Sequence, residues 1–208
     1  MSRLLHIAAS PRRERSESAA LATTFLDRYR ELDPLATVDV LDLWDGTLPD
    51  FGPAAAAAKM TVFAGGTPDG DEGEAWARTV ATFRRFDSYD RYLFSVPMWN
   101  AGIPYILKQF IDVVSQPGMA FGFDPVDGYT GLLRGKKAVL ILTSAVYGPG
   151  RPPSFGNDFQ APYLRDWLRW AGVTDIDEVH FRPNLATGDA DAARTRAHRE
   201  ARDAAAKL

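Results

Sequence analysis

Short apolar runs alternate along the chain with longer stretches in which apolar residues recur at helical spacing. The runs of strand length are Leu4–Ala9, Thr37–Leu41, Tyr92–Val96 and Ala138–Thr143, with a candidate edge strand at Glu178–Phe181. Helical spacing covers Glu17–Leu32, a stretch from about Pro104 to Val114, Ala161–Ala171 and the charged tail Asp189–Leu208. Strands that alternate with helices pair in parallel through right-handed crossovers. The pattern therefore predicts an α/β fold, a three-layer doubly wound parallel sheet.

One segment, at about residues 51–73, departs from this alternation. Its first part, PAAAAAKMTVFAG, predicts a helix, and its second part, GGTPDGDEG, predicts an exposed, turn-rich loop. We interpret this Gly/Ala-rich segment as an insertion in a single domain that spans residues 1–208, since 208 residues suit one core.

Composition and charge exclude several classes of function. The balance of 24 basic against 27 acidic residues gives a net charge of −3, so we expect no nucleic-acid partner. The absence of cysteine excludes disulfides, thiolate nucleophiles and iron–sulfur clusters. His6, His180 and His198 have no metal-ligand spacing, so we expect no metal site.

The hydropathy of the chain predicts no membrane partner. No apolar run reaches the length of a membrane helix, and the N-terminal run Leu4–Ala9 is too short for a signal peptide. We therefore expect a cytoplasmic protein.

Serines gather where the first predicted strand leads into the first predicted helix. Ser10 ends the strand, and Ser16 and Ser18 flank the start of the helix. The amides and partial positive charge of a helix N-terminus favour an anion, and hydroxyls can donate to phosphate oxygens. A monophosphate fits better than a pyrophosphate, because the chain has neither G-x-G-x-x-G nor a Walker motif. The alternative is that the serines only cap the helix.

A second candidate loop, SVPMWNAGIP, leaves the strand Tyr92–Val96 at the same edge of the sheet. The Asn100 amide offers a donor and an acceptor to the edge of a planar heterocycle, and Met98 and Trp99 are suited to flank such a ring. The alternative is a turn in which Asn100 is favoured for its backbone tolerance.

Taken together, these residues resemble the FMN-dependent NADH-azoreductases, which are quinone and azo reductases of flavodoxin-like fold. The resemblance runs in order along nearly the whole chain. Its motifs are Ser10 with Ser16-Glu17-Ser18, Pro97-Met98-Trp99-Asn100 followed by Ile103-Pro104 and Lys108, Phe121-Gly122-Phe123, Gly131-Leu132-Leu133-Arg134-Gly135-Lys136-Lys137-Ala138, and Pro162 to Asp175.

The resemblance implies three groups of FMN-binding residues. They are Ser10, Ser16, Glu17 and Ser18; Pro97, Met98, Trp99, Asn100 and Ala101; and Ser144, Ala145, Val146 and Tyr147. In the third group the family usually has S-R-G-G, so Ala145 and Val146 imply a different contact with the flavin edge. Ala101 replaces a frequent aromatic residue and should widen the pocket.

Aromatic residues are the candidates for a pocket that takes a planar substrate. They are Phe121, Phe123, Phe155 and Phe159, and core packing is the alternative explanation for them.

The function implied is that of an FMN-dependent oxidoreductase that passes two electrons from NADH or NADPH to quinones or azo compounds by ping-pong hydride transfer. Because the flavin carries the chemistry, no catalytic side chain is required. The resemblance also implies a homodimer. The alternatives are a non-catalytic flavin-binding electron carrier and, if Ala145 and Val146 close the pocket, a protein without flavin.

Overall fold

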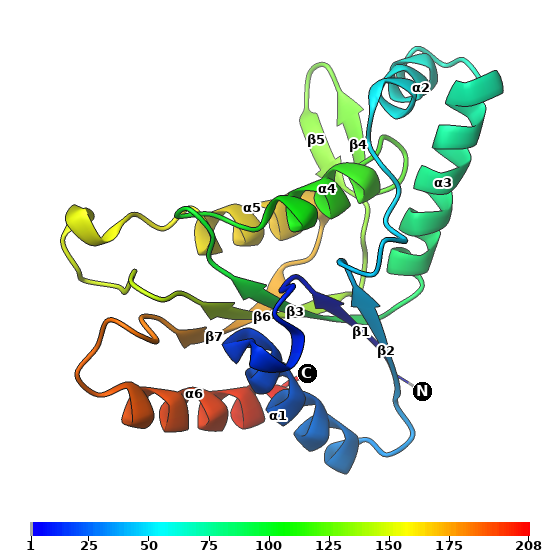
Figure 1. The fold of residues 1–208 in the computed structure, drawn as a ribbon. Coiled ribbons are helices and arrows are strands. Elements are labelled where there is room, and N and C mark those ends of the chain that lie inside the picture. Colours follow the sequence, from blue (N-terminus) through cyan, green and yellow to red (C-terminus); the bar gives the residue numbers. More distant parts are fainter. Residues whose placement is uncertain (1) are drawn as a thin grey trace.

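A five-stranded parallel sheet forms the centre of the computed structural model, which describes residues 2–208 (Figure 1). The strands lie in the order β2-β1-β3-β6-β7. Their bounds are β1 Arg3–Ala8, β2 Thr37–Asp42, β3 Arg91–Pro97, β6 Lys137–Thr143 and β7 Asp175–Phe181. This order has the switch in direction next to β1 that defines the flavodoxin-like arrangement, so the predicted fold is confirmed.

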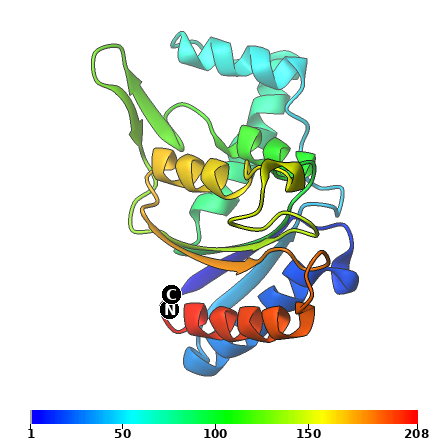
Figure 2. The same ribbon diagram turned by 90° about the vertical axis from the view of Figure 1, so that its left-hand side faces the viewer.

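Helices cover both faces of the sheet, as Figures 1 and 2 show. On one face lie α1 Glu17–Leu32 and α6 Ala190–Ala205, and on the other α3 Gly70–Asp87, α4 Tyr105–Val114 and α5 Ala161–Ala171. Alternate strand residues point to opposite faces, so Leu4 and Leu93 pack with α1 and α6 while Leu5 and Phe94 pack on the other side. The two apolar layers hold the strand ends in fixed positions.

The alanine-rich segment forms helix α2, Pro53–Phe63, as predicted, but the loop expected after it is wrong from Gly70 onward. Helix α3 begins there, with Asp71 and Glu72 in its first turn, where carboxylates interact favourably with the helix dipole. Buried Thr79, Phe83 and Phe86 then continue the helix at helical spacing. The acidic, glycine-rich run is therefore in part the start of a helix.

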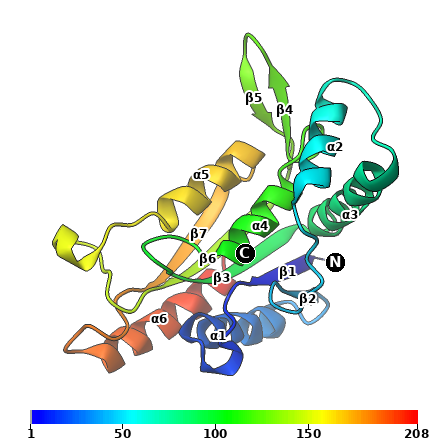
Figure 3. The ribbon, with the colours of Figure 1, turned by 45° about the horizontal axis from the view of Figure 1, so that its top comes forward.

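A β-hairpin that the sequence pattern does not predict stands beside α2, away from the main sheet (Figure 3). It consists of β4 Phe121–Asp124 and β5 Gly128–Gly131, paired antiparallel. Two short 3₁₀ helices, η1 Arg13–Arg15 and η2 Pro153–Phe155, complete the elements. Within residues 2–208, no helix combines the length and apolar character needed to cross a membrane.

Candidate functional site

The carboxyl ends of the central strands open onto a cavity of about 220 Å³. Its lining comes from the segments that follow β1, β3, β6 and β7: Ser10, Arg12, Arg15, Ser16, Glu17, Pro97, Met98, Trp99, Thr143, Ser144, Ala145, Asn184 and Leu185. All three predicted groups of residues thus contribute to one cavity. This is the edge at which doubly wound sheets bind ligands.

The three predicted serines are buried at one end of this cavity. Ser16 caps helix α1, because its Oγ accepts a hydrogen bond from Ala19 N at 3.4 Å. Ser10 and Ser16 also line the cavity, whereas Ser18 is outside the lining and lies against Ser16, with 3.0 Å between their Oγ atoms. Ser16 therefore both caps α1 and lines the cavity.

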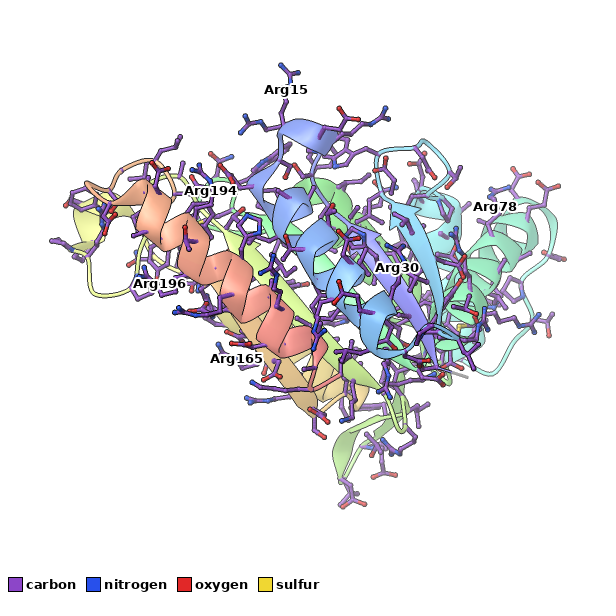
Figure 4. All side chains as sticks on the ribbon, turned by 90° about the horizontal axis from the view of Figure 1, so that it is seen from below. Arg15, Arg30, Arg78, Arg165, Arg194 and Arg196 are labelled. Atoms are coloured by element: carbon purple, nitrogen blue, oxygen red, sulfur yellow. The ribbon has the colours of Figure 1, made fainter. Side chains whose placement is uncertain are left out.

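Charge at the serine end of the cavity favours an anion. Glu17 lies in the lining, but its charge is offset by Arg194 of α6, labelled in Figure 4, through hydrogen bonds of 2.8 and 3.4 Å. Arg12 and Arg15 also belong to the lining, and both residues are exposed. Neither is predicted from the sequence as a site residue, because exposed arginines at a helix start are more often solvated.

The loop after β3 forms the opposite wall. Met98 N donates to Thr143 O at 2.7 Å, which joins the loop to the end of β6. Trp99 and Gly102 exchange two backbone hydrogen bonds of 2.9 Å, and the residues between them, Asn100 and Ala101, have φ values of 48° and 69°. Two successive positive φ values define a type I′ turn. Asn100 is thus a turn residue, and it and Ala101 form the turn's tip beside the residues that line the cavity.

The loop after β6 closes the third side without the glycines of the family motif. Ser144 Oγ donates to Tyr147 O at 2.6 Å, and Asn184 N donates to Ser144 O at 2.8 Å. Gly148 instead lets this loop pass close to Pro183, because a Cβ at Gly148 would lie 2.6 Å from Pro183 Cδ. Ala145 reaches the cavity, while Val146 is exposed outside its lining.

Asn184 and Leu185 complete the lining and are not predicted from the sequence. They lie within a few residues of the end of β7, as Ser10 does for β1 and Ser144 for β6. A polar residue just after a predicted strand is the signal by which Asn184 could have been found.

The structure does not bring the four predicted pocket aromatics together. Phe121 packs on Trp170 in the hairpin region, with ring centroids 4.7 Å apart. Phe123 packs on Tyr129 of the same hairpin at 5.0 Å. Phe155 lies under the Arg151 guanidinium at 4.7 Å. Phe159 is bonded to the turn beside the cavity, since its backbone N donates to Ala101 O at 2.9 Å.

Histidines have structural surroundings in this fold. His6 lies on β1 with Nε2 2.9 Å from Ser95 Oγ, and burial lowers its pKa to about 4. His198 Nδ1 lies 2.7 Å from Thr24 Oγ1, which joins α6 to α1. No cluster of three or more metal-ligating side chains occurs among residues 2–208.

Comparison with known proteins gives matches over the whole chain. The family model described as "Flavodoxin-like fold" matches residues 2–205. A curated relative from Ruegeria pomeroyi, named FMN-dependent NADH:quinone oxidoreductase, is 47% identical over 197 residues, covering 95% of this chain and 97% of the relative. FMN-dependent NADH:quinone oxidoreductase 1 from Bradyrhizobium diazoefficiens is 39% identical, covering 99% of both chains. Among solved structures, an azoreductase from Bacillus anthracis str. Sterne has a TM-score of 0.91 at 27% identity, with both chains fully covered.

Proposed function

This chain belongs to the flavodoxin-like fold family, and from that premise we propose that it is an FMN-dependent oxidoreductase. It takes a hydride from NADH or NADPH and passes two electrons to a quinone or an azo compound. One observation carries the proposal: a single cavity is lined both by Ser10 and Ser16, which suit an anion, and by the apolar Met98 and Trp99. The relatives' names support the substrates, and since those relatives are oxidoreductases the electron-carrier alternative is not favoured.

The residues present fit a flavin mononucleotide. Its phosphate requires buried donors and positive charge, which Ser10, Ser16, Arg12, Arg15 and the N-terminal amides of α1 supply. Neutralisation of Glu17 by Arg194 removes the repulsion that its carboxylate would otherwise exert on a phosphate.

A planar ring fits the rest of the cavity. It requires apolar surface and a few polar groups, which the Pro97–Trp99 wall and Ser144 supply. Asn100, Ala101, Val146 and Tyr147 border this end from outside the lining, and their contacts with the ring remain part of the proposal.

When bound, FMN supplies the acceptance and delivery of the hydride. The chain's own residues bind and orient the reactants, and the apolar Met98 and Trp99 keep water from the reacting face. Glu17 is the one carboxylate in the lining, and it forms an ion pair with Arg194. We therefore propose that no side chain acts as a catalytic residue.

The chain has no G-x-G-x-x-G motif to mark a second dinucleotide site, so NAD(P)H and the acceptor are proposed to use the space over the ring in turn. Initial rates over a grid of both substrates should give parallel double-reciprocal lines. Intersecting lines would show a separate nucleotide site and contradict the shared cavity. A purified protein that binds FMN but does not oxidise NADH or NADPH would support the electron carrier instead, and a protein that binds no flavin would refute both.

We also propose a homodimer. The supporting surface is an exposed apolar cluster on α2 and the hairpin, formed by Met60, Phe63, Phe123, Val126 and Tyr129. Phe63 and Phe123 touch across these two elements, with ring centroids 6.2 Å apart. Contiguous exposed apolar surface of this kind is typical of an interface. Light scattering should give twice the mass of one chain, and a monomer would contradict the proposal.

The proposed location is the cytoplasm. The support for it is the proposed reductant, because NADH and NADPH are regenerated by cytoplasmic metabolism. Cell fractionation with detection of the native protein checks this directly, and recovery in the membrane or secreted fraction would contradict it.

A further inference from the structure

The segment just before α5 is bonded at two points to the loop that follows β3, one at the start of the loop and one at the tip of its turn. Gln160 is fully buried, and its Nε2 donates to Val96 O at 3.0 Å, immediately before the loop. The neighbouring Phe159 N donates to Ala101 O at 2.9 Å, at the tip of the turn. The position of Pro97–Ala101 is therefore tied to the position of this segment.

Asp158 in turn fixes the shape of the segment. Its Oδ1 accepts hydrogen bonds from Gln160 N and Ala161 N, both at 3.0 Å. Its Oδ2 accepts from Arg182 Nη1 at 2.8 Å. The Arg182 side chain is only 3% exposed, so this is a buried, charge-assisted pair. Removing one partner leaves the other charge buried without compensation, which is a costly change.

Arg182 is held from its other side by β7. A guanidinium only donates hydrogen bonds, so His180 Nδ1 accepts from Arg182 Nη2, and His180 Nε2 carries the hydrogen that it donates to Glu178 at 2.9 Å. Arg182 also lies over the Tyr147 ring, 5.4 Å from its centroid. One guanidinium thus connects the edge strand, the loop after β6 and the segment before α5.

We propose that Asp158, Gln160 and Arg182 form a positioning unit that sets the ring-binding wall of the site. The inference rests on the proposed function, since the wall is the part of the cavity assigned to the flavin ring. None of the three residues lines the cavity, so they act through the loop Pro97–Ala101. Binding of the ring therefore depends on a buried ion pair that touches neither the ring nor the substrates.

The test compares the dissociation constants of FMN and of riboflavin, which has the same ring but no phosphate. Asp158→Asn removes the charge that holds Arg182, and Gln160→Leu removes the bond to Val96 O. Each should weaken FMN and riboflavin by the same factor, about tenfold, because the lost hydrogen bond no longer holds the wall that contacts the ring, which both ligands share, and leaves the phosphate end unchanged. The absorption spectrum of bound flavin should also shift, which a merely structural role would not produce.

Lys137→Gln is the control. It breaks the ion pair of Lys137 with Asp175, which joins β6 to the same strand β7 but has no contact with Arg182, His180, Glu178 or the segment 158–160. This variant should keep both dissociation constants and the spectrum. Arg182→Lys, which keeps a donor for Asp158, should bind riboflavin better than Arg182→Ala. Unchanged riboflavin binding in Asp158→Asn and Gln160→Leu, or an equal loss in Lys137→Gln, would overturn the inference.

The two proposals fail in different ways. If the unaltered protein binds neither FMN nor riboflavin, the proposed function is refuted. Amide hydrogen exchange of the protein without flavin still tests the positioning unit. Exchange at Trp99 and Gly102, whose amides close the turn, should be faster in Asp158→Asn than in Lys137→Gln. Equal exchange in the two variants would refute the unit by itself.

Discussion

At the scale of single residues, the site reuses groups that the fold already needs. Ser16 caps α1 and faces the cavity, and Ser144 orders its own loop and lines the wall. Sequence reasoning finds such residues because they follow predicted strands. It does not find Arg12 or Arg15, because an exposed arginine carries no signal until the cavity beside it is known. It also cannot decide the role of Asn100, since the turn requires the same residue type that a ring edge would.

A prediction at this scale separates the two ends of the site. Ser16→Ala removes a hydroxyl at the end of the cavity proposed to bind the phosphate and should weaken FMN by about tenfold to a hundredfold, the value of one charge-assisted hydrogen bond. Riboflavin has no phosphate, so its dissociation constant should stay unchanged. Flavin fluorescence titration measures both. Thr23→Ala, an exposed hydroxyl on the same helix, is the control and should change neither. Equal losses for FMN and riboflavin would show that Ser16 acts only as a helix cap.

At the scale of elements, long periodic segments are predictable and short ones are not. The main strands and α1, α4 and α5 follow from apolar spacing and from Pro at helix starts. The hairpin is not predicted because each of its strands has only four residues, too few to show a clear alternation of apolar and polar positions. Its pairing is set by tertiary contact: Phe121 packs on Trp170 of α5, about fifty residues further along the chain. The start of α3 escapes because glycine and acidic residues mark loops as readily as helix N-termini.

Two glycines from separate sequence motifs, Gly131 and Gly172, meet where the hairpin contacts the end of α5. A Cβ on Gly131 would lie 2.3 Å from Gly172 N and 2.5 Å from Ala171 C, so there is no room for a side chain at Gly131. Gly131→Ala should therefore destabilise the protein by about 3 kcal/mol or more, because backbone cannot move aside as a flexible side chain can. Urea denaturation measures this loss.

Gly135→Ala serves as the control for this contact. Gly135 has φ +67° but open space around a Cβ, so only backbone strain of about 1 kcal/mol is expected there. Similar losses for the two variants would show that backbone crowding at Gly131 is not the cause.

At the scale of the whole molecule, the sheet order decides where the site lies. β1 and β3 are neighbours, and the helices that follow them, α1 and α4, cover opposite faces. The connections that leave β1 and β3 therefore run to opposite faces of the sheet, and the cavity opens between these two loops. Sequence predicts this edge from the alternation of strands and helices. It does not predict the Arg182–Asp158 connection, because that pairing depends on the register of β7 and the path into α5.

The molecule should lose stability in acid over two pH ranges, one set by the buried His6 and the other by the partly buried Glu178. Burial lowers the pKa of His6 to about 4 from 6.5, so the folded state resists a proton that the unfolded chain accepts. The stability that comes from neutral His6 is complete above pH 6.5 and is lost as the pH falls toward 4. Burial alone would raise the pKa of Glu178, but hydrogen bonds from His180 and Arg165 outweigh it and lower the pKa to about 2. Its contribution is complete above pH 4.5 and is lost toward pH 2.

Each step should be removable by itself. His6→Gln keeps a polar partner for Ser95 but does not titrate, so the fall in the free energy of unfolding between pH 6.5 and 4, about 3 kcal/mol in the unaltered protein, should flatten. Glu178→Gln should keep that first fall and flatten the one between pH 4.5 and 2. Urea unfolding at a series of pH values measures both variants against the unaltered chain. An undiminished slope above pH 4.5 in His6→Gln would mean that other groups, rather than the buried imidazole under the site, set the response of the fold to mild acid.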